Sequence, residues 1–444
     1  MVDRPISRRT FLGHLAAAGA AFTIVPRHVL GRGFVPPSDK LGIACIGVGG
    51  RGAANVRGVA SEALVAFCDV DDERAAEIYR TYPNVPRYKD FRVMLEREGR
   101  HIDAVVISTP DHTHAAAAMM AIQMGKHVYC EKPLTRTIYE ARRLSEAARQ
   151  HRVVTQMGNQ GHAGEGTRQI REWIEAGAIG TVREIHFWTN RPIWPQAIER
   201  PMEAYHVPPT LDWDLWLGPA PERPYHPAYV PFKWRGWWDF GTGALGDMGC
   251  HIMDAAFWTF DLRDPVRVTA ETTPVFPETA PLVSRVTYEF AARGNRPALQ
   301  VVWRDGNLAP PRPPQWEADK PWPPMDSGQM FIGDEGVLIA GTYGENPRLI
   351  PERRHQEWIA SAPAPRYPRS PGVYQEWIEA CKNGGQAGSN FPDYAGPLTE
   401  MVLLGNLAVR IGGSIEWDAA ALRVTNVEVP EEYIRPTYRR GWSL

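Results

Sequence analysis

The sequence has few cysteines, almost no net charge and no long apolar stretch. Its 444 residues include five cysteines, an odd number that excludes a fully paired disulfide framework, so we expect the chain to fold with reduced thiols. The formal net charge is −2 and no basic run follows the N-terminal segment, which argues against nucleic acid as a partner. These deficits favour a small, weakly charged molecule as the partner.

The longest apolar run near the N-terminus is too short to cross a bilayer. It covers the eleven uncharged residues 15–25, whereas a membrane-spanning helix needs about 20. The run follows Arg8-Arg9 and Phe11, and together they resemble a twin-arginine signal, which directs export of folded proteins. We expect residues 1–35 to be this signal and the mature protein to be exported or periplasmic, without membrane contact. A retained signal anchor and a chance arginine pair stay open as alternatives.

The remaining chain of about 400 residues is longer than one hydrophobic core usually serves, so we expect two domains. Residues 38–160 alternate short apolar strands with helical segments, which predicts a parallel, doubly wound Rossmann sheet. Residues 161–444 contain strands that alternate apolar and polar residues, which predicts an α/β domain with a mainly antiparallel sheet. Helices are expected on one face of this sheet, with the other face open to a partner subunit. Late helices over residues 374–381 and 398–411 are expected to return to the first domain.

One segment of the second domain is rich in proline. Residues 310–324 contain seven prolines, which exclude a helix or a central strand because proline fixes φ and lacks an amide donor. An ordered surface arm and a mobile loop remain as alternatives.

A glycine motif follows the first predicted strand, residues 43–46. In Gly47-x-Gly49-x-x-Gly52, the first glycine allows a tight turn, the second lets the backbone approach a pyrophosphate, and the third lets a helix pack on its strand. Asp69 ends the next predicted strand, 22 residues after Gly47, where a carboxylate can bind a ribose 2′-hydroxyl. This order of strand, turn, helix, strand and acid predicts a dinucleotide site and a nicotinamide-dependent oxidoreductase.

The same acid bears on which dinucleotide is bound. Asp69 favours NAD, because the 2′-phosphate of NADP would meet its negative charge. Arg51 and Arg74 can pair with such a phosphate, so NADP stays open.

Two further motifs point to a known family. The tripeptide Glu-Lys-Pro at residues 131–133 follows a predicted strand, and Asp247 precedes His251 by four residues, with Asp254 just beyond. With the glycine motif, these segments resemble the Gfo/Idh/MocA family, named for glucose–fructose oxidoreductase, inositol dehydrogenase and a rhizopine-catabolism protein. The resemblance extends from about residue 40 onward. It implies a Rossmann domain followed by an open-faced α/β domain, a sugar or cyclitol substrate, and a homodimer or homotetramer.

These motifs supply three groups suited to alcohol oxidation. The reaction needs a base for the hydroxyl proton, a cation beside the developing alkoxide, and a nicotinamide to take the hydride. Lys132 lies at the carboxyl end of a parallel strand, where doubly wound sheets bind ligands, and is expected to stabilise the oxyanion. His251 is the expected base, since imidazole has an ordinary pKa of about 6.5. Asp247 lies one helical turn earlier and is expected to orient the imidazole or bind substrate.

The resemblance extends the expected site beyond these three residues. The expected cofactor contacts are Gly47, Gly49, Gly50, Arg51, Gly52, Asp69, Thr109, Pro110, His114, Glu131 and Lys132. The expected substrate contacts are Lys132, Trp237, Trp238, Asp247, His251 and Asp254. The tryptophans are included because aromatic rings stack on the C–H faces of sugars, although core packing explains a typical tryptophan cluster. Asp254 is equally explained as a structural acid.

Other polar and aromatic residues receive weaker assignments. The weaker pocket candidates are Asn159, His162 and Arg191. Trp213 and Trp216 are assigned to the core. His112 and His114 form a His-x-His pair, but they open a predicted helix and have no third ligand nearby, so no metal is expected.

Export adds a constraint on the cofactor. We expect no soluble nicotinamide pool outside the inner membrane, so an exported enzyme should retain its cofactor and restore it on site. The first hypothesis is hydride transfer between NAD(P) and a hydroxyl or carbonyl of a sugar, sugar derivative or cyclitol. The alternative is redox-neutral cleavage of a glycoside, known in one branch of the family. The third is a non-catalytic sugar-sensing protein.

Overall fold

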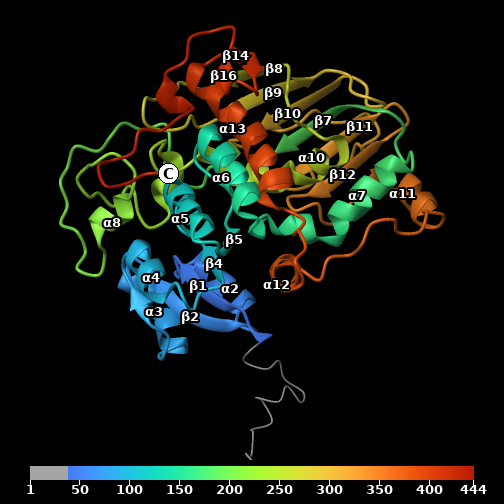
Figure 1. Cartoon of the computed structure of the whole chain (residues 1–444). Coiled ribbons are helices and arrows are strands. Elements are labelled where there is room, and N and C mark those ends of the chain that lie inside the picture. The colour runs from blue at the N-terminus through green and yellow to red at the C-terminus, as the bar shows by residue number, and fades with distance from the viewer. Residues whose placement is uncertain (1–38) are drawn as a thin grey trace, which may run out of the picture.

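The computed structural model describes residues 39–444, and the predicted export signal over residues 1–35 lies outside the described residues. Figure 1 shows two sheets, each with its own helices, on either side of a central group of helices. Between residues 39 and 444, none of the helices is long and apolar enough to cross a membrane. Over the same range, no group of three or more His, Cys, Asp or Glu side chains is arranged to hold a metal ion.

The first sheet has six parallel strands in the order β3-β2-β1-β4-β5-β6. Its central strands are apolar throughout because helices cover both faces, as in other parallel sheets. Successive strands are added on one side of β1 up to β3 and on its other side from β4 onward, and the carboxyl ends of strands at such a switch in strand order form a ligand crevice. The strands are β1 (Gly42–Ile46), β2 (Ala63–Cys68), β3 (Arg87–Tyr88), β4 (Ala104–Ile107), β5 (His127–Cys130) and β6 (Thr155–Met157).

Helices connect these strands, and several begin where a side chain caps the backbone. The Asp71 side chain accepts a hydrogen bond from the Glu73 amide at the start of α3, and Thr137 and Glu140 form a capping box at the start of α6. A late helix, α12 (Val373–Asn383), packs on this domain through the buried Trp377. The connecting helices are α2 (Arg51–Gly58), α3 (Asp72–Thr81), α4 (Phe91–Glu98), α5 (Asp111–Gln123) and α6 (Ile138–His151).

The second sheet has eight strands in the order β13-β12-β11-β7-β10-β9-β8-β14. One pair of neighbours, β7 and β10, is parallel and every other pair is antiparallel, which confirms the predicted fold class. The strands are β7 (Val182–Trp188), β8 (Arg267–Thr272), β9 (Ser284–Phe290), β10 (Leu299–Arg304), β11 (Gly328–Gly333), β12 (Val337–Gly341), β13 (Arg348–Ile350) and β14 (Ser414–Ile415). The short strands β15 (Trp417–Asp418) and β16 (Arg423–Val424) form a separate pair.

Helices cover the inner face of this sheet, and the proline-rich segment covers part of the outer face. The inner helices are α7 (Glu165–Glu175), α9 (Gly243–Ile252), α10 (Asp254–Phe260) and α13 (Gly396–Ile411). On the outer face, Trp316, Trp322 and Met325 pack against the cluster that contains Trp188 and Met330. Of the two alternatives for residues 310–324, the ordered arm is therefore the one observed. The outward side chains of β9 remain half exposed.

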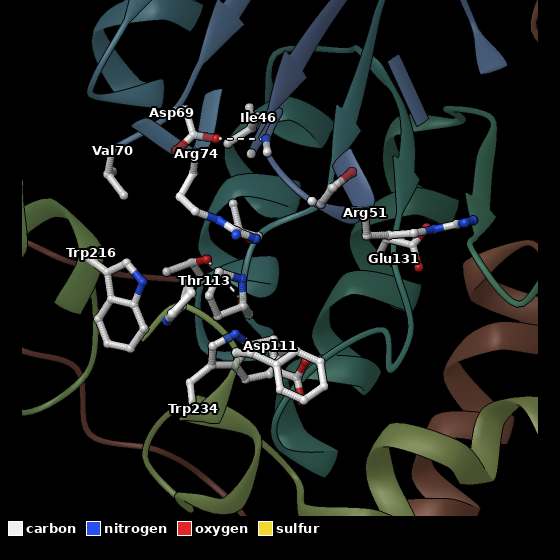
Figure 2. Close-up of a pocket in the computed structure, with 18 of the residues that line it drawn as sticks. Ile46, Arg51, Asp69, Val70, Arg74, Asp111, Thr113, Glu131, Trp216 and Trp234 are labelled. Carbon is white, nitrogen blue, oxygen red and sulfur yellow. Dashed lines mark hydrogen bonds and ion pairs between the residues drawn. The ribbon is translucent and has the colours of Figure 1, made fainter. Parts of the chain in front are cut away.

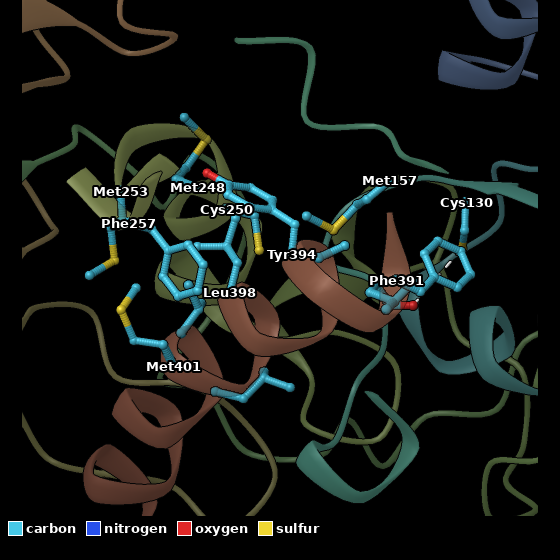
Figure 3. Packing of buried hydrophobic residues seen from close by; sticks show 14 of the residues in the cluster. Cys130, Met157, Met248, Cys250, Met253, Phe257, Phe391, Tyr394, Leu398 and Met401 are labelled. Atoms are coloured by element: carbon cyan, nitrogen blue, oxygen red, sulfur yellow. Dashed lines mark hydrogen bonds between the residues drawn. The ribbon is translucent and has the colours of Figure 1, made fainter. Parts of the chain in front are cut away.

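The two domains share one continuous core. Figure 3 shows Cys130 and Met157, from the first sheet, in the same cluster as Cys250 of α9 and Leu398 of α13. Interiors of this kind are close-packed and resist relative movement of their parts. The shared core therefore fixes the carboxyl ends of β5 and β6 against α9, and that contact sets the geometry of the site.

Candidate active site

A cavity of about 510 Å³ opens at the carboxyl ends of the first sheet's strands. The glycine loop lines one side, and Asp247 and His251 of α9 line another. Figure 2 shows Asp69 and Arg74 above the cavity, with Trp216 and Trp234 of the second domain below them. The cavity therefore holds the predicted nucleotide motif and the predicted catalytic motif in one continuous space.

The glycine loop has no room for side chains. A Cβ on Gly52 would overlap the carbonyl oxygen of Gly47, and a Cβ on Gly49 would lie 2.8 Å from the carbonyl oxygen of Arg74. Gly47 itself has a φ of 75°, which favours glycine. The loop leads into the N-terminus of α2, whose first turn carries no side-chain cap. A backbone cradle next to an uncapped helix start fits a dinucleotide pyrophosphate.

Asp69 lies at the end of β2 and holds the glycine loop. Its Oδ2 accepts hydrogen bonds from the Val48 and Gly49 amides at 2.8 and 3.1 Å, and its Oδ1 accepts one from the Asp71 amide at 3.0 Å. Burial raises the pKa of the Asp69 carboxyl. Asp69 still lines the cavity at the place expected for the ribose, and the structure adds a loop-holding role that the sequence did not indicate.

Glu131 joins β5 to the start of α2. Its Oε1 accepts hydrogen bonds from Arg51 Nε at 3.0 Å and from Asn55 Nδ2 at 2.9 Å. Tyr374 of α12 completes the network, since its hydroxyl accepts from Arg51 at 3.2 Å and donates to Asn55 at 2.6 Å. Glu131 and Arg51 both line the cavity, and Asn55 and Tyr374 are partners that the sequence motifs did not indicate.

Lys132 and Asp247 meet across the domain boundary. Lys132 Nζ lies 2.9 Å from Asp247 Oδ1 and also donates to the Asp247 backbone carbonyl. Arg235 Nε donates to the same carboxylate oxygen at 3.0 Å. Burial alone would raise the pKa of Asp247, but these two cations hold it well below the usual range. The carboxylate is therefore charged at all working pH values and fixes the lysine at the cavity wall.

His251 lies one turn further along α9. Its ring packs edge-to-face against Tyr343, with centroids 4.8 Å apart, and its Nδ1 is buried without a hydrogen-bond partner among residues 39–444. Burial, followed by the charge of Lys132, lowers the pKa of His251 well below its ordinary value. The imidazole is therefore neutral near pH 7 and able to accept a proton.

Asp111 is a site residue that the sequence analysis missed. It is the first residue of α5, lines the cavity and accepts a hydrogen bond from Thr242 Oγ1 at 2.8 Å. Burial raises its pKa to about 7, against the opposing effect of Lys132. A usable signal was present, because Asp111 follows Thr109-Pro110 at the carboxyl end of a parallel strand.

Several predicted contacts lie outside the cavity lining. Trp237 donates from Nε1 to the Ala228 carbonyl at 3.0 Å, inside an aromatic cluster of the second domain, and Trp238 belongs to the main core. The His114 ring bridges the Thr109 and Pro133 carbonyls at 2.9 Å each, behind the cavity wall. Gly52 also lies behind the wall, whereas Thr109, Pro110 and Arg191 line the cavity.

Asp254 serves a buried network rather than the cavity. Its carboxylate accepts from Asn159 Nδ2 and the Tyr394 hydroxyl, both at 2.8 Å, and lies 3.2 Å from His162 Nδ1. None of these four residues lines the cavity. The Asp254 carboxylate therefore connects α10 to the segment after β6. This is the structural role that the sequence analysis named as the alternative to substrate contact.

Other aromatic residues take the place expected for Trp237 and Trp238. Arg235 stacks on Trp234 and Phe232, with its guanidinium carbon 4.2 and 4.3 Å from the ring centroids. Trp216 belongs to the core cluster of the second domain, as the sequence analysis assigned it, and its edge also lines the cavity. The aromatic residues that line the cavity are Phe91, Trp194, Trp216, Phe232, Trp234, Tyr343 and Trp442.

Two family models match the chain. Residues 41–159 match the NAD-binding Rossmann fold of the Gfo/Idh/MocA oxidoreductases, and residues 169–307 match the C-terminal α/β domain of that family. Among similar proteins, inositol 2-dehydrogenase 3 of Saccharopolyspora erythraea is 31% identical over 188 residues, 39% of this chain and 53% of that protein. The rhizopine catabolism protein MocA of Rhizobium meliloti is 31% identical over 264 residues, 59% of this chain and 66% of that protein.

Levoglucosan dehydrogenase of Pseudarthrobacter phenanthrenivorans is 27% identical over 195 residues, 43% of this chain and 40% of that protein. The chain thus spans about half the length of the curated relatives it matches. Among solved structures, the WlbA dehydrogenase from Bordetella pertussis, in complex with NADH and UDP-GlcNAcA, has a TM-score of 0.59 at 17% identity, covering 85% of this chain and 99% of its own. Aldose-aldose oxidoreductase from Caulobacter crescentus has a TM-score of 0.57 at 17% identity, covering 85% of this chain and 100% of its own. These two likenesses show the fold.

Proposed function

The chain belongs to the Gfo/Idh/MocA oxidoreductase family, and from this premise we propose that it transfers a hydride between NAD(P) and a hydroxyl-bearing carbon of a sugar, sugar derivative or cyclitol. One observation carries the proposal. Lys132, Asp247 and His251 line the same cavity as the glycine loop and Asp69. The substrate class is supported by the similarity to levoglucosan dehydrogenase and to inositol 2-dehydrogenase 3.

The roles of the three residues follow from their surroundings. A dinucleotide whose pyrophosphate is bound at the glycine loop would supply a nicotinamide as the hydride acceptor for the carbon being oxidised. Neutral His251 takes the hydroxyl proton, since its lowered pKa leaves the imidazole unprotonated. Lys132 stabilises the oxyanion that forms, and Asp247 holds the ammonium group at 2.9 Å in a fixed place. Binding and orientation of the substrate ring fall to Arg235 and the aromatic rings beside it.

The residues near the ribose favour NAD over NADP. Asp69 places a carboxylate at the end of β2, where it can accept hydrogen bonds from ribose hydroxyls and would repel a 2′-phosphate. Arg74 lies beside the loop, with a guanidinium nitrogen 2.9 Å from where a Cβ on Gly50 would be. This arginine leaves NADP as the less favoured cofactor. Affinities for NADH and NADPH, measured by calorimetry, decide between them.

Substitution of Lys132 tests the proposed activity. Lys132→Met should abolish reduction of NAD by a panel of sugars and cyclitols while leaving NADH affinity nearly unchanged. Lys126→Met is the matched control, because Lys126 lies in the same domain and its ammonium group donates, within residues 39–444, only to the Gly99 carbonyl. Full turnover by Lys132→Met would refute the assignment.

Redox-neutral glycoside cleavage is the second candidate function. Phe232 is 42% exposed at the cavity mouth, and its ring lies 5.8 Å from that of Trp194. These rings extend the cavity beyond Asp247 and can receive the leaving group of a glycoside. Products distinguish the two candidates: a ketone or lactone indicates oxidoreduction, and a released aglycone without net redox change indicates cleavage.

The proposal includes export through the twin-arginine pathway. Its support is the pair Arg8-Arg9 ahead of the uncharged residues 15–25. Replacing both arginines with lysine should leave the protein in the cytoplasmic fraction, whereas the unchanged chain should be found outside the inner membrane. Equal distribution of both forms would contradict the export proposal.

Assembly into a homodimer or homotetramer is also proposed. Its support is the outer face of β9, where Arg285, Thr287 and Glu289 are half exposed while the residues between them are buried. Light scattering on the purified protein gives the mass, and a monomer at working concentration would contradict this proposal.

A further inference from the structure

The C-terminal segment beyond the family-matched residues returns to the cavity. After the turn at Glu431–Tyr433, the chain runs beside α6, where the Tyr438 hydroxyl donates to Glu140 Oε1 at 2.7 Å. Figure 1 shows this segment in red, crossing towards α5 and α8 (Trp213–Leu217). Neither family model covers residues 431–444.

Arg439 fixes the segment to the second domain. Its Nε donates to the Gly218 carbonyl at 3.1 Å, and its Nη2 donates to the Asp214 carbonyl at 2.9 Å. The guanidinium also pairs with the Asp214 carboxylate, and the Arg439 amide donates to the Pro219 carbonyl at 3.0 Å. Four interactions from one residue hold the chain in place immediately before the cavity.

Trp442 extends from this attachment to the first domain. Its ring lies 5.8 Å from the Phe91 ring, and the Arg92 guanidinium lies 4.1 Å from its centroid. Arg92 Nη1 also donates to the Gly441 carbonyl at 3.2 Å. Trp442 and Phe91 both line the cavity.

The strand order shows which half of a dinucleotide this wall would contact. The order of the parallel strands switches between β1 and β4. Lys132 follows β5 on one side of that switch point. Asp69 and Phe91 follow β2 and β3 on the other side, which is the adenosine half of a Rossmann site. Trp442 therefore belongs to the adenosine end of the cavity, opposite the residues proposed for hydride transfer.

A second segment covers the same end. The Asp212 amide donates to the Val70 carbonyl at 2.9 Å, and the Asp72 amide donates to the Thr210 carbonyl at 3.1 Å. These bonds fix residues 210–212 of the second domain against the end of β2, and Leu211 and Trp216 line the cavity beside them. Together with Trp442, they cover the groove from the side away from the glycine loop.

Resting on the proposed function, we propose that Trp442 binds the adenosine half of the dinucleotide and that residues 435–444, held by Arg439, close over it and slow its release. An indole beside an adenine provides a flat apolar surface for stacking. Slow release agrees with a cofactor that stays bound through successive turnovers.

Binding of ADP-ribose and NADH to the full chain tests the proposal, because ADP-ribose lacks the nicotinamide and probes the adenosine half alone. Trp442→Ala should weaken both ligands by roughly tenfold or more, the range found for loss of a base-stacking aromatic residue, and should speed NADH release in stopped-flow fluorescence. Trp442→Phe should restore most of the affinity. Lys132→Met should leave ADP-ribose affinity unchanged.

Two neighbouring arginines provide a variant and its matched control for testing whether residues 435–444 slow the release of NADH. Arg439→Ala should speed NADH release, whereas Arg440→Ala should not, because Arg440 is exposed and its side chain forms no hydrogen bond or ion pair with residues 39–444. Arg439→Ala also keeps the test available if Trp442→Ala fails to fold. Unchanged ADP-ribose affinity in folded Trp442→Ala, or equal release rates for the two arginine variants, would overturn the inference alone. Failure of the unsubstituted protein to bind either ligand would refute the proposed function, and the inference with it.

Discussion

Asp111→Asn should raise the free energy of unfolding above that of the unsubstituted protein, and this gain should be larger at alkaline pH than at acidic pH. Asp111 is 3% exposed, and burial raises its pKa from 3.8 to about 7. Between about pH 4 and 7, the folded protein holds a proton that the unfolded chain releases, so the free energy of unfolding falls as the pH rises. Above the pKa of the folded state, the buried carboxyl is ionised, and this lowers the free energy of unfolding by about 4 kcal/mol, at ~1.4 kcal/mol per pKa unit.

Asparagine removes this cost because it does not ionise, and its side-chain oxygen can still accept the hydrogen bond from Thr242. The stability gap between variant and unsubstituted protein should therefore widen by about 3 kcal/mol between about pH 5 and about pH 8.5. Urea unfolding at both pH values measures the gap. Asp319→Asn is the control, since Asp319 is exposed and the substitution removes the same charge. A gap for Asp111→Asn that stays constant across this range would refute the assignment of a proton to Asp111.

Three further predictions separate binding roles from structural roles. Gly52→Ala should lower NADH affinity by at least about tenfold in calorimetry, because the added methyl group overlaps the Gly47 carbonyl oxygen. Gly385→Ala is the control and should leave the affinity unchanged, because the added Cβ would lie 3.9 Å from its nearest atom, the Cα of Ala380. Asp254→Asn should lower the free energy of unfolding by about 2 kcal/mol with KM unchanged, since its carboxylate serves buried partners; a raised KM with normal stability would restore it to the substrate site. Trp234→Ala should raise KM for the sugar, whereas Trp237→Ala should mainly lower the melting temperature, because only Trp234 faces the cavity; the reverse pattern would contradict the geometry.

The parts of the site that were predictable rest on local signals. The glycine loop, Asp69 and the Glu-Lys-Pro tripeptide each lie within a few residues of a strand end, so strand periodicity alone places them at one edge of the sheet. The Asp247 and His251 pair follows from helical spacing. Asp111 carries the same kind of signal, because it begins α5 shortly after the end of the buried parallel strand β4.

The remaining contacts depend on partners distant in the sequence. Asp254 is tied to Asn159 and Tyr394, and no local pattern around Asp254 distinguishes that network from a cavity contact. Which tryptophan lines the cavity depends on the path of residues 190–240, whose helical segments Trp213–Leu217 and Lys233–Gly236 are too short to show a periodicity in the sequence. Trp442 is held at the cavity by contacts with distant residues, among them the pairing of Arg439 with Asp214, 225 residues earlier, and the bond from Arg92 to Gly441.

The most direct test of the central claim is the nucleotide content of the purified protein. After extensive buffer exchange, the protein is denatured and the released nucleotide is identified by mass spectrometry, with and without prior incubation with candidate sugars and cyclitols. We expect near-stoichiometric NAD(H), with NAD converted to NADH by one class of polyol in the unsubstituted chain and not in Lys132→Met. Protein that carries no nicotinamide nucleotide, and binds none when NAD or NADP is added, would contradict the central claim.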